Sequence, residues 1–394
     1  MNSKGYMRIL IITGIFPPDI GGPATYVPQI AKGLFERGHE VQVLTTSEPE
    51  HLSHDDAEYP FSVFRMNRRL SLWFRPLFYI QQILRYGREV DLIYANGVFL
   101  ETALANLWLR KPLVIKVVGD EAWERATRRG WSHNGFEDFQ RRRQPILGEI
   151  LKGLRSWAVS RADRVITPSQ YLRRFIVGWG APEYRCTVVY NAADENEIDQ
   201  SISPGGPISL PGVFHGKVCL ITAGRLVPWK GIDLIIRVLP NLPEAVLTVV
   251  GDGPCRQQLE ALAKSVGVSD RVWFVGSVSK AVLRALLQKH DIFVLASSYE
   301  GLPHIILEAM RSGLAVVATA VGGIPEVLRG GKDGILVKSD DGTLPFALKQ
   351  LVQDSAFRMS LASNARLAVK ESFSCNRMTV QTESVLLTLK GDQH

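Results

Sequence analysis

Two carboxylates stand eight positions apart in the stretch EGLPHIILEAMRSG, residues 300–313, which is otherwise largely apolar. In a helix rising 1.5 Å per residue, Glu300 and Glu308 would lie about 12 Å apart. Carboxylates that share a proton or flank one scissile bond lie closer, at about 5 to 9 Å. The spacing therefore favours one elongated ligand held at both ends over a paired-acid mechanism.

The surrounding residues indicate what such a ligand would be. Gly301 and Pro303 mark a turn after the strand-like run DIFVLAS, so a helix is expected to begin near Leu302 or Pro303. Its first backbone N–H groups can bind phosphate, and carboxylates accept hydrogen bonds from vicinal diols. A nucleoside diphosphate sugar fits, with ribose at Glu308 and hexose at Glu300. An alternative stays open, in which Glu300 complements the helix dipole and Glu308 is a solvated helix residue.

Two further loops follow predicted strands. AGRLVPWKGIDLII (223–236) brings Arg225 and Lys230 together before a helix, and two such cations suit a diphosphate. GIFPPDIGGPATYV (14–27) contains Gly21–Gly22, which allow the backbone to approach a ligand closely. The simpler interpretations are a solvated pair of cations and a flexible turn.

Short apolar runs alternate with helical patterns, which predicts parallel sheets with helices on both faces, an α/β class. The predicted strands are 8–13, 41–46, 90–97, 112–119, 163–169, 218–224, 245–253, 271–276, 291–297 and 314–319, and a helix is predicted over 25–40. We predict an N-terminal domain at 1–200, a linker at 201–212, a C-terminal domain at 213–375, and a tail at 376–394 that could return to the first domain. A ligand is then expected in a cleft between the two domains.

Composition narrows the class of protein. The chain has 394 residues, 46% hydrophobic and 22% charged, with a net charge of +7 that favours an anionic partner. Its four cysteines show no CxxC spacing, which indicates neither a zinc site nor a disulfide framework and favours the cytoplasm. The apolar run near the N-terminus is interpreted as a strand, and no stretch is apolar enough to span a membrane. The sequence lacks GxGxxG, GxxxxGK[ST] and DxD motifs, so a dinucleotide oxidoreductase is disfavoured and neither a metal nor a cofactor is expected.

Together, IFPPDIGGPATYV, AGRLVPWKGIDLII, VVGDGP, DIFVLASSYEGLPHIILEAMRSGLAVVATAVGGIPEVL and GILV resemble the retaining GT-B glycosyltransferases of family 4. The resemblance implies two Rossmann-like domains and metal-independent transfer of a hexosyl unit from a UDP- or GDP-linked sugar. It implies that cations bind the donor diphosphate, that Glu308 binds ribose and that Glu300 orients the sugar. The implied donor-binding residues are Gly22, Gly224, Arg225, Lys230, Gly276, Val278, Glu300, Gly301, Leu302, Pro303, His304 and Glu308, and the implied catalytic ones are Glu300, Asp120, Arg225 and Lys230.

One position departs from the family pattern. Where many relatives carry a histidine, this chain reads VVGDEAWE, and Asp120 is the nearest polar group, with Glu121 as a competitor. We expect Asp120 to contact the sugar or the acceptor. A nucleotide-sugar epimerase and a nucleotide-binding protein without transfer activity remain alternatives.

The only features of the sequence that bear on the acceptor are its basic and aromatic segments. Residues 70–88 and 125–185 are rich in arginine, and aromatic side chains lie in or next to them, including Trp123, Phe136, Phe139 and Trp179. A basic, aromatic surface suits an anionic bilayer, so we expect a peripheral cytoplasmic enzyme of polysaccharide or lipopolysaccharide synthesis acting on a lipid-linked or oligosaccharide acceptor. The alternative is that these aromatics are core residues and the arginines are solvated. No nucleic-acid motif is present.

Overall fold

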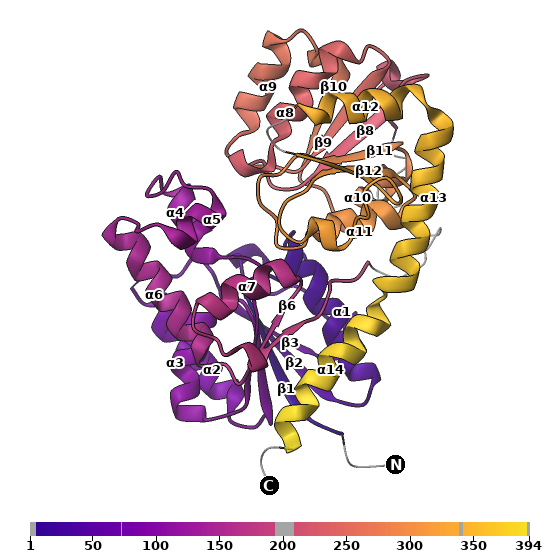
Figure 1. Ribbon diagram of the computed structural model, residues 1–394. Helices are drawn as coiled ribbons and strands as arrows, with labels where there is room; N and C mark the ends of the chain where they lie inside the picture. Colours follow the sequence, from indigo (N-terminus) through magenta and orange to yellow (C-terminus); the bar gives the residue numbers. More distant parts are fainter. Residues whose placement is uncertain (1–4, 72, 194–208, 339–341, 392–394) are drawn as a thin grey trace. The chain divides into compact units, whose positions relative to one another are not determined.

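The chain forms two compact units, each built on one parallel sheet. The computed structural model describes residues 5–71, 73–193, 209–338 and 342–391 (Figure 1). Unit 1 comprises Met1–Asn191 with Cys375–His394, and unit 2 comprises Ala192–Ser374. Most of the predicted linker, at 201–208, lies outside the described residues.

The sheet of unit 1 has seven parallel strands in the order β3-β2-β1-β4-β5-β6-β7. The central strand β1 is buried at five of its six positions, as its apolar sequence RILIIT requires in a sheet covered on both faces. The chain runs outward from β1 to β3 and then returns to β4, so the direction reverses between β1 and β4. The strands are β1 (Arg8–Thr13), β2 (Glu40–Ser47), β3 (Ser62–Asn67), β4 (Leu92–Asn96), β5 (Leu113–Lys116), β6 (Arg164–Thr167) and β7 (Cys186–Val188).

Helices cover both faces of this sheet. α1 and the C-terminal helix α14 pack together on one face, and α2, α3 and α6 pack in series on the other (Figure 1). Arg37 and His39 both contact Glu383 of α14, which fastens that helix to the unit. The helices of unit 1 are α1 (Gly22–Glu36), α2 (Arg75–Gly87), α3 (Phe99–Leu109), α4 (Glu121–Arg128), α5 (Phe136–Arg141), α6 (Ile146–Ser160), α7 (Gln170–Gly178) and α14 (Cys375–Gly391).

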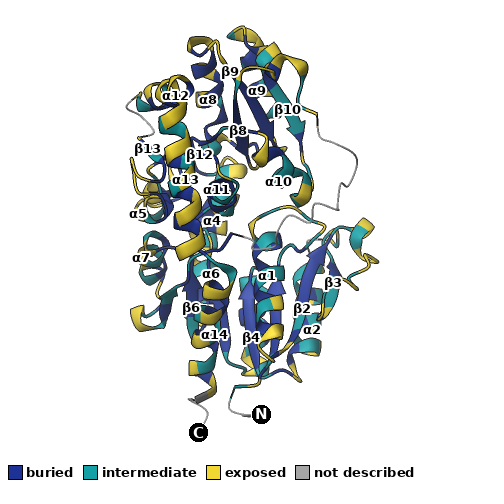
Figure 2. Cartoon of the chain, turned by 90° about the vertical axis from the view of Figure 1, so that its right-hand side faces the viewer, coloured by how far each residue is buried: buried dark blue, intermediate teal, exposed yellow. Residues whose placement is uncertain are grey.

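Unit 2 repeats the plan with six parallel strands in the order β10-β9-β8-β11-β12-β13. Its core joins both faces of the sheet through side chains such as Leu247, Ile235 and Leu348, and the strands are the most buried elements (Figure 2). The strands are β8 (Val218–Ala223), β9 (Ala245–Val250), β10 (Val272–Gly276), β11 (Ile292–Leu295), β12 (Ala315–Thr319) and β13 (Ile335–Val337). The helices are α8 (Ile232–Val238), α9 (Arg256–Ser265), α10 (Lys280–Gln288), α11 (His304–Arg311), α12 (Thr343–Gln353) and α13 (Ser355–Ser372).

The predicted doubly wound α/β class is confirmed. Three strands were not predicted. β7 and β13 are three residues long, and β3 is an edge strand whose sequence SVFRMN mixes polar and apolar residues without a continuous apolar run. The helix predicted over 25–40 begins earlier, at Gly22, and ends at Glu36, because Gly38 adopts a φ of 92°.

Candidate active site

Unit 2 brings two predicted loops together at the point where its strand order reverses. The strands β8 and β11 are neighbours although β9 and β10 intervene in the sequence. Their carboxyl ends lead into the loops 224–231 and 296–303, and Ser298 N–H donates to the carbonyl of Trp229 at 2.8 Å. Such reversal points are where open α/β sheets bind ligands.

Lys230 and Glu300 form an ion pair across these loops. Lys230 Nζ lies 2.6 Å from Glu300 Oε1, and Ser297 Oγ donates to the same oxygen at 2.7 Å. The side chains are 19% and 9% exposed. Glu300 therefore holds the ammonium group at the edge of the sheet, where an arriving diphosphate could share its remaining hydrogen bonds.

Two glycines make this approach of loops possible. Gly231 has a φ of 62°, and a Cβ there would lie 2.0 Å from the carbonyl oxygen of Ala296. Gly322, in the loop after β12, has a φ of 60°, and a Cβ there would lie 1.6 Å from the carbonyl oxygen of Glu300. Gly323 N–H also donates to that carbonyl, at 3.3 Å. The glycines of AVGGIP thus fix the backbone of Glu300.

A second set of close approaches supports the Arg225 loop. A Cβ on Gly251 would lie 2.0 Å from the carbonyl oxygen of Gly224, and Gly251 N–H donates to the carbonyl of Gly276 at 2.8 Å. Gly276 ends β10 with a φ of 83°. The stretch VVGDGP therefore lies between Gly224 and Gly276, two of the predicted donor-binding residues.

The predicted cations differ in their surroundings. Arg225 is exposed, and no ion pair or side-chain hydrogen bond joins it to another described residue. Lys230 is engaged by Glu300. An incoming anion would thus meet a guanidinium that is free to move and an ammonium that is already placed.

Glu308 lies on the helix that follows Glu300. α11 begins at His304 after Pro303, so residues 300–303 are not helical and the helical estimate of about 12 Å does not apply to the whole interval. Glu308 is the fifth residue of α11 and is 9% exposed. Gly301 and Leu302 are buried, while Pro303, His304 and Val278 are half-buried.

In unit 1 the predicted glycine loop precedes α1. Gly22 is the first residue of that helix and is exposed. Arg65 donates to the carbonyl of Pro17 at 2.7 Å, and Arg68 donates to the carbonyl of Gly14 at 3.2 Å and pairs with Asp19. These two arginines hold the loop, and sequence reasoning missed them because β3, which contains Arg65 and ends just before Arg68, was not predicted.

Asp120 was expected to contact a ligand, but its carboxylate is bound by other residues of the chain. It is fully buried, one of its oxygens caps α4 by accepting from Ala122 N–H at 3.0 Å, and the other pairs with Arg155 at 2.5 Å. Gln140 donates to that second oxygen at 2.7 Å. This geometry argues against a contact between Asp120 and the sugar or acceptor, whereas Glu121 beside it is exposed.

Lys116 is a buried ionisable group that sequence reasoning overlooked. It ends β5 with no exposed surface, donates to Asn191 Oδ1 at 3.1 Å, and its Nζ lies 3.3 Å from the centre of the Tyr26 ring. Burial lowers the pKa of the Lys116 ammonium well below its ordinary value. The available signal was a lysine in the middle of the apolar run PLVIKVVG.

The aromatic residues of 123–179 do not form the expected surface. Trp123, Phe136, Phe139 and Trp179 are buried, and Arg155 stacks on Trp179 at 3.9 Å. The prediction of an aromatic face over this segment is therefore wrong for these four side chains, which are core residues. Trp73 and Phe74, in the earlier basic segment, are exposed.

Neither a spanning helix nor a metal cluster is found in the part of the chain that the structure describes. None of its helices is both long and apolar enough to cross a bilayer. No three His, Cys, Asp or Glu side chains among these residues gather as a metal site would require.

Two parallel-sheet domains with a polar site at the reversal point define a GT-B architecture, and comparison with known proteins agrees. The Anabaena protein HepE, solved with UDP and glucose, superposes with a TM-score of 0.77 at 22% identity, covering 97% of this chain and 100% of that one. This likeness establishes the fold.

The family follows from sequence. The model of glycosyl transferases group 1 matches residues 211–368, and that of Glycosyltransferase Family 4 matches residues 20–197. A glycosyltransferase of Methanocaldococcus jannaschii is 27% identical over 96% of this chain and 97% of its own length. One subunit of the human phosphatidylinositol N-acetylglucosaminyltransferase is 26% identical over 82% of this chain and 63% of its own length. The chain belongs to the GT-B glycosyltransferases of family 4, and it is a glycosyltransferase.

Proposed function

We propose that this glycosyltransferase moves a hexosyl unit from a nucleoside diphosphate sugar to an acceptor hydroxyl, with retention of configuration and without a metal ion. The observation that carries the proposal is the Lys230–Glu300 pair at the reversal point of unit 2. It places a cation beside a carboxylate at the sheet edge where a diphosphate and its sugar would meet. The residues proposed to bind the donor are Gly22, Gly224, Arg225, Lys230, Gly276, Val278, Glu300, Gly301, Leu302, Pro303, His304 and Glu308.

The diphosphate is assigned to the two cations. Lys230 offers a point charge already oriented by Glu300, and the exposed Arg225 offers a planar fork that can close on the phosphates. The first turn of α11 carries no acidic residue, so its N–H groups add positive potential. When the bond between the anomeric carbon and the phosphate breaks, these groups stabilise the negative charge that develops on the leaving diphosphate.

The sugars are assigned to the two glutamates. Glu308 accepts from the ribose hydroxyls, and Glu300 orients the hexose while it holds Lys230. The acceptor oxygen attacks the anomeric carbon from the face that the diphosphate leaves, and its proton passes to the departing phosphate. We leave Asp120 out of this assignment because both of its oxygens are engaged by buried partners.

The donor is proposed to carry uridine or guanosine, and the acceptor to be a lipid-linked or cell-envelope glycan at a cytoplasmic membrane surface. UDP and glucose accompany the HepE structure, which supports a uridine donor. The name of the human relative refers to phosphatidylinositol, which supports a lipid acceptor. The net charge of +7 agrees with an anionic membrane partner.

The first experiment is a thermal-shift series with UDP, GDP, ADP and NAD, each with and without EDTA. A ligand at a hundred times its dissociation constant stabilises the native state by about 2.7 kcal/mol, which is readily measured. We expect UDP or GDP to raise the melting temperature and EDTA to leave the shift unchanged. A shift with NAD alone, or with none of the four, would contradict the donor assignment.

The reaction itself is then tested with the donor sugar that corresponds to the stabilising nucleotide. We expect release of the nucleoside diphosphate to depend on an added membrane extract, and the product to keep the anomeric configuration of the donor. Epimerisation without an acceptor would instead identify a nucleotide-sugar epimerase.

A further inference from the structure

One face of unit 1 exposes an unusual amount of apolar surface. The helices α2, α3 and α6, which pack in series, and the turn that precedes α2 all contribute large exposed side chains. Trp73 is 87% exposed, Trp108 is 69% exposed and Ile146 is 80% exposed. The others are Phe74, Leu77, Leu107, Leu147, Ile150 and Leu154. Apolar surface gathered on neighbouring helices marks an interaction site, whereas isolated exposed apolar residues do not.

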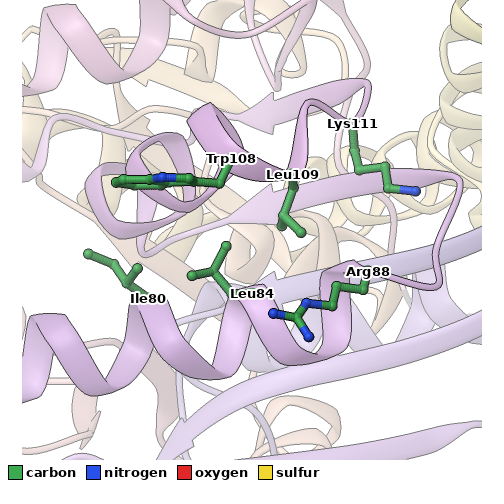
Figure 3. Close-up of a pocket in the computed structure, with 6 residues that line it drawn as sticks. All are labelled: Ile80, Leu84, Arg88, Trp108, Leu109 and Lys111. Atoms are coloured by element: carbon green, nitrogen blue, oxygen red, sulfur yellow. The ribbon is translucent and has the colours of Figure 1, made fainter.

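A groove lies within this face, between α2 and α3. It encloses about 550 Å³ and is lined by Ile80, Leu84, Arg88, Trp108, Leu109 and Lys111. Figure 3 shows the Trp108 ring opposite Ile80 and Leu84, with Arg88 and Lys111 on either side of the part beyond Leu109 and their charged ends pointing in different directions. The groove is therefore amphipathic along its length, with an apolar part at one end and two separate cations towards the other.

The two cations have no ion-pair partner among the described residues. The nearby Asp91 is taken by Arg8, whose Nη2 lies 2.8 Å from Asp91 Oδ1. No acidic residue lines the groove. Arg88 and Lys111 follow the C-terminal ends of α2 and α3, where they also complement the helix dipoles. That role accounts for the charges, but it does not account for the adjoining apolar lining.

We propose that this groove binds one anionic phospholipid of a bilayer, with its headgroup at the end that carries Arg88 and Lys111 and an acyl chain along Ile80, Leu84 and Trp108. The volume is in the range of small-molecule sites. The exposed tryptophans suit the boundary between headgroups and acyl chains, and the unpaired cations suit a phosphate. The surrounding apolar side chains of α2, α3 and α6 would enter the same leaflet. The proposal locates the membrane contact of the proposed function but does not depend on the nucleotide site.

The test is binding of the full chain to phosphatidylcholine vesicles with and without phosphatidylglycerol, followed by flotation. A Lys or Arg at an anionic surface contributes about 1 kcal/mol, so we expect the double variant Arg88→Gln/Lys111→Gln to bind anionic vesicles about thirty-fold more weakly. Trp108→Ser should weaken binding to both kinds of vesicle. UDP or GDP binding by each variant, measured separately, reports whether unit 2 and the donor assignment are intact.

Matched controls lie on the opposite face of the sheet. Lys32→Gln removes an exposed cation from α1, and Phe35→Ser removes an apolar side chain that is 40% exposed. We expect both controls to bind vesicles like the wild type. If they weaken binding as much as the groove variants do, the attraction is a general effect of charge and the groove proposal is overturned.

Short-chain phosphatidylglycerol below its micelle concentration distinguishes a lipid site from an adhesive surface. We expect saturable binding of one lipid per chain in titration calorimetry, abolished in Arg88→Gln/Lys111→Gln. Absence of this binding in the wild type would overturn the proposal. So would a dimer in sedimentation velocity that Trp108→Ser dissociates, because the face would then be covered by a second copy of the chain.

Discussion

The two units use the same strand reversal to build different sites. In unit 2 the reversal between β8 and β11 carries the partly buried Lys230–Glu300 pair, held by loops whose close contacts require glycine. In unit 1 the Arg68–Asp19 ion pair belongs to the loop after β1, and the contacts between the ends of β1 and β4 are made by neutral groups. Thr13 Oγ1 donates to the carbonyl of Asn96 at 3.3 Å, and a Cβ on Gly97 would lie 2.9 Å from Gly14 N.

The difference indicates that the two units place their charged side chains for different purposes. Unit 2 concentrates opposite charges where a diphosphate and sugar hydroxyls would bind. In unit 1, Arg65 and Arg68 hold the glycine loop that follows β1, and Arg88 and Lys111 lie in the groove of the α2–α3 face. The same architecture would therefore support donor chemistry in one unit, whereas in the other the cations at the reversal point hold a loop and a separate surface is basic and apolar.

The largest expected effect is the loss of turnover in Lys230→Ala, which removes the cation that distinguishes the site of unit 2. Removing a group aimed at developing charge lowers turnover by about a hundred- to a thousand-fold. Glu300 would also lose its partner, so a smaller fall in melting temperature should accompany the loss. Lys264→Ala, which removes an exposed lysine of α9, is the matched control in rate assays. Turnover of Lys230→Ala near the wild-type value would contradict the donor assignment.

The next largest effect is expected from alanine at glycines that make close backbone contacts. In Gly322→Ala the new Cβ meets the Glu300 carbonyl at 1.6 Å, so the loop must move in addition to the strain of a positive φ. We expect a loss of stability of about 3 kcal/mol, measured by denaturant unfolding.

Two glycines provide the comparison for Gly322. Gly331 has a φ of 79°, but a Cβ added there would meet no atom within 4 Å. Gly331→Ala should therefore lower the free energy of unfolding by only about 1 kcal/mol. Gly97→Ala in unit 1 meets Gly14 N at 2.9 Å and should fall between the two. Equal losses at all three positions would mean that backbone strain alone decides the outcome and that the close approach in unit 2 is unimportant.

A more selective effect is expected from Glu308→Ala. If Glu308 binds ribose, loss of hydrogen bonds to a charged group lowers UDP or GDP affinity by about 1.5–3 kcal/mol, roughly ten- to a hundred-fold. Titration calorimetry measures this, with Glu260→Ala on α9 as the control. An unchanged dissociation constant would remove Glu308 from the ribose and leave the donor assigned to Lys230 and Arg225.

The contrast between the units also explains what the sequence could predict. The loops around Gly231, Gly251 and Gly322 could be predicted because only glycine fits their close backbone contacts. Glycines next to predicted strands are therefore visible in the sequence as a pattern. The doubly wound class was predicted for a similar reason, because strands covered on both faces need continuous apolar runs.

What escaped prediction depends on distant pairing. Asp120 meets Gln140 and Arg155, which lie 20 and 35 positions away, so nothing local distinguished a buried cap from a ligand-binding carboxylate. The segment 125–185 has the composition of a surface, yet Phe136 and Phe139 are core residues, whereas Ile146 and Ile150 of α6 in the same segment are exposed. The exposed face thus lies partly in the predicted segments, on α6 and at α2, and partly on α3, because exposure depends on which helix flank the sheet leaves uncovered.

The smallest expected effects concern pH, and they come from a buried basic group in each unit. His290 in unit 2 donates from Nδ1 to the carbonyl of Leu286 at 2.6 Å, and Nε2 lies 2.7 Å from Thr248 Oγ1. Burial lowers the pKa of His290 below 6.5. The unfolded chain then binds more protons between that lowered pKa and 6.5, so His290 makes the protein less stable as pH falls through this window. His290→Gln should flatten the acid side of the melting-temperature profile.

Lys116 in unit 1 acts in a higher window with the same sign. Its folded pKa lies well below 10.5, so the unfolded chain binds more protons from that lowered value up to 10.5, and stability rises with pH there. Lys116→Met removes the titration, and its advantage in melting temperature over the wild type should shrink as pH rises towards 10.5. A constant difference between the two proteins would show that Lys116 keeps its charge in the fold. Unit 1 would then bury a further cation in addition to Arg155 and Arg65, and the two units would differ less than their reversal points indicate.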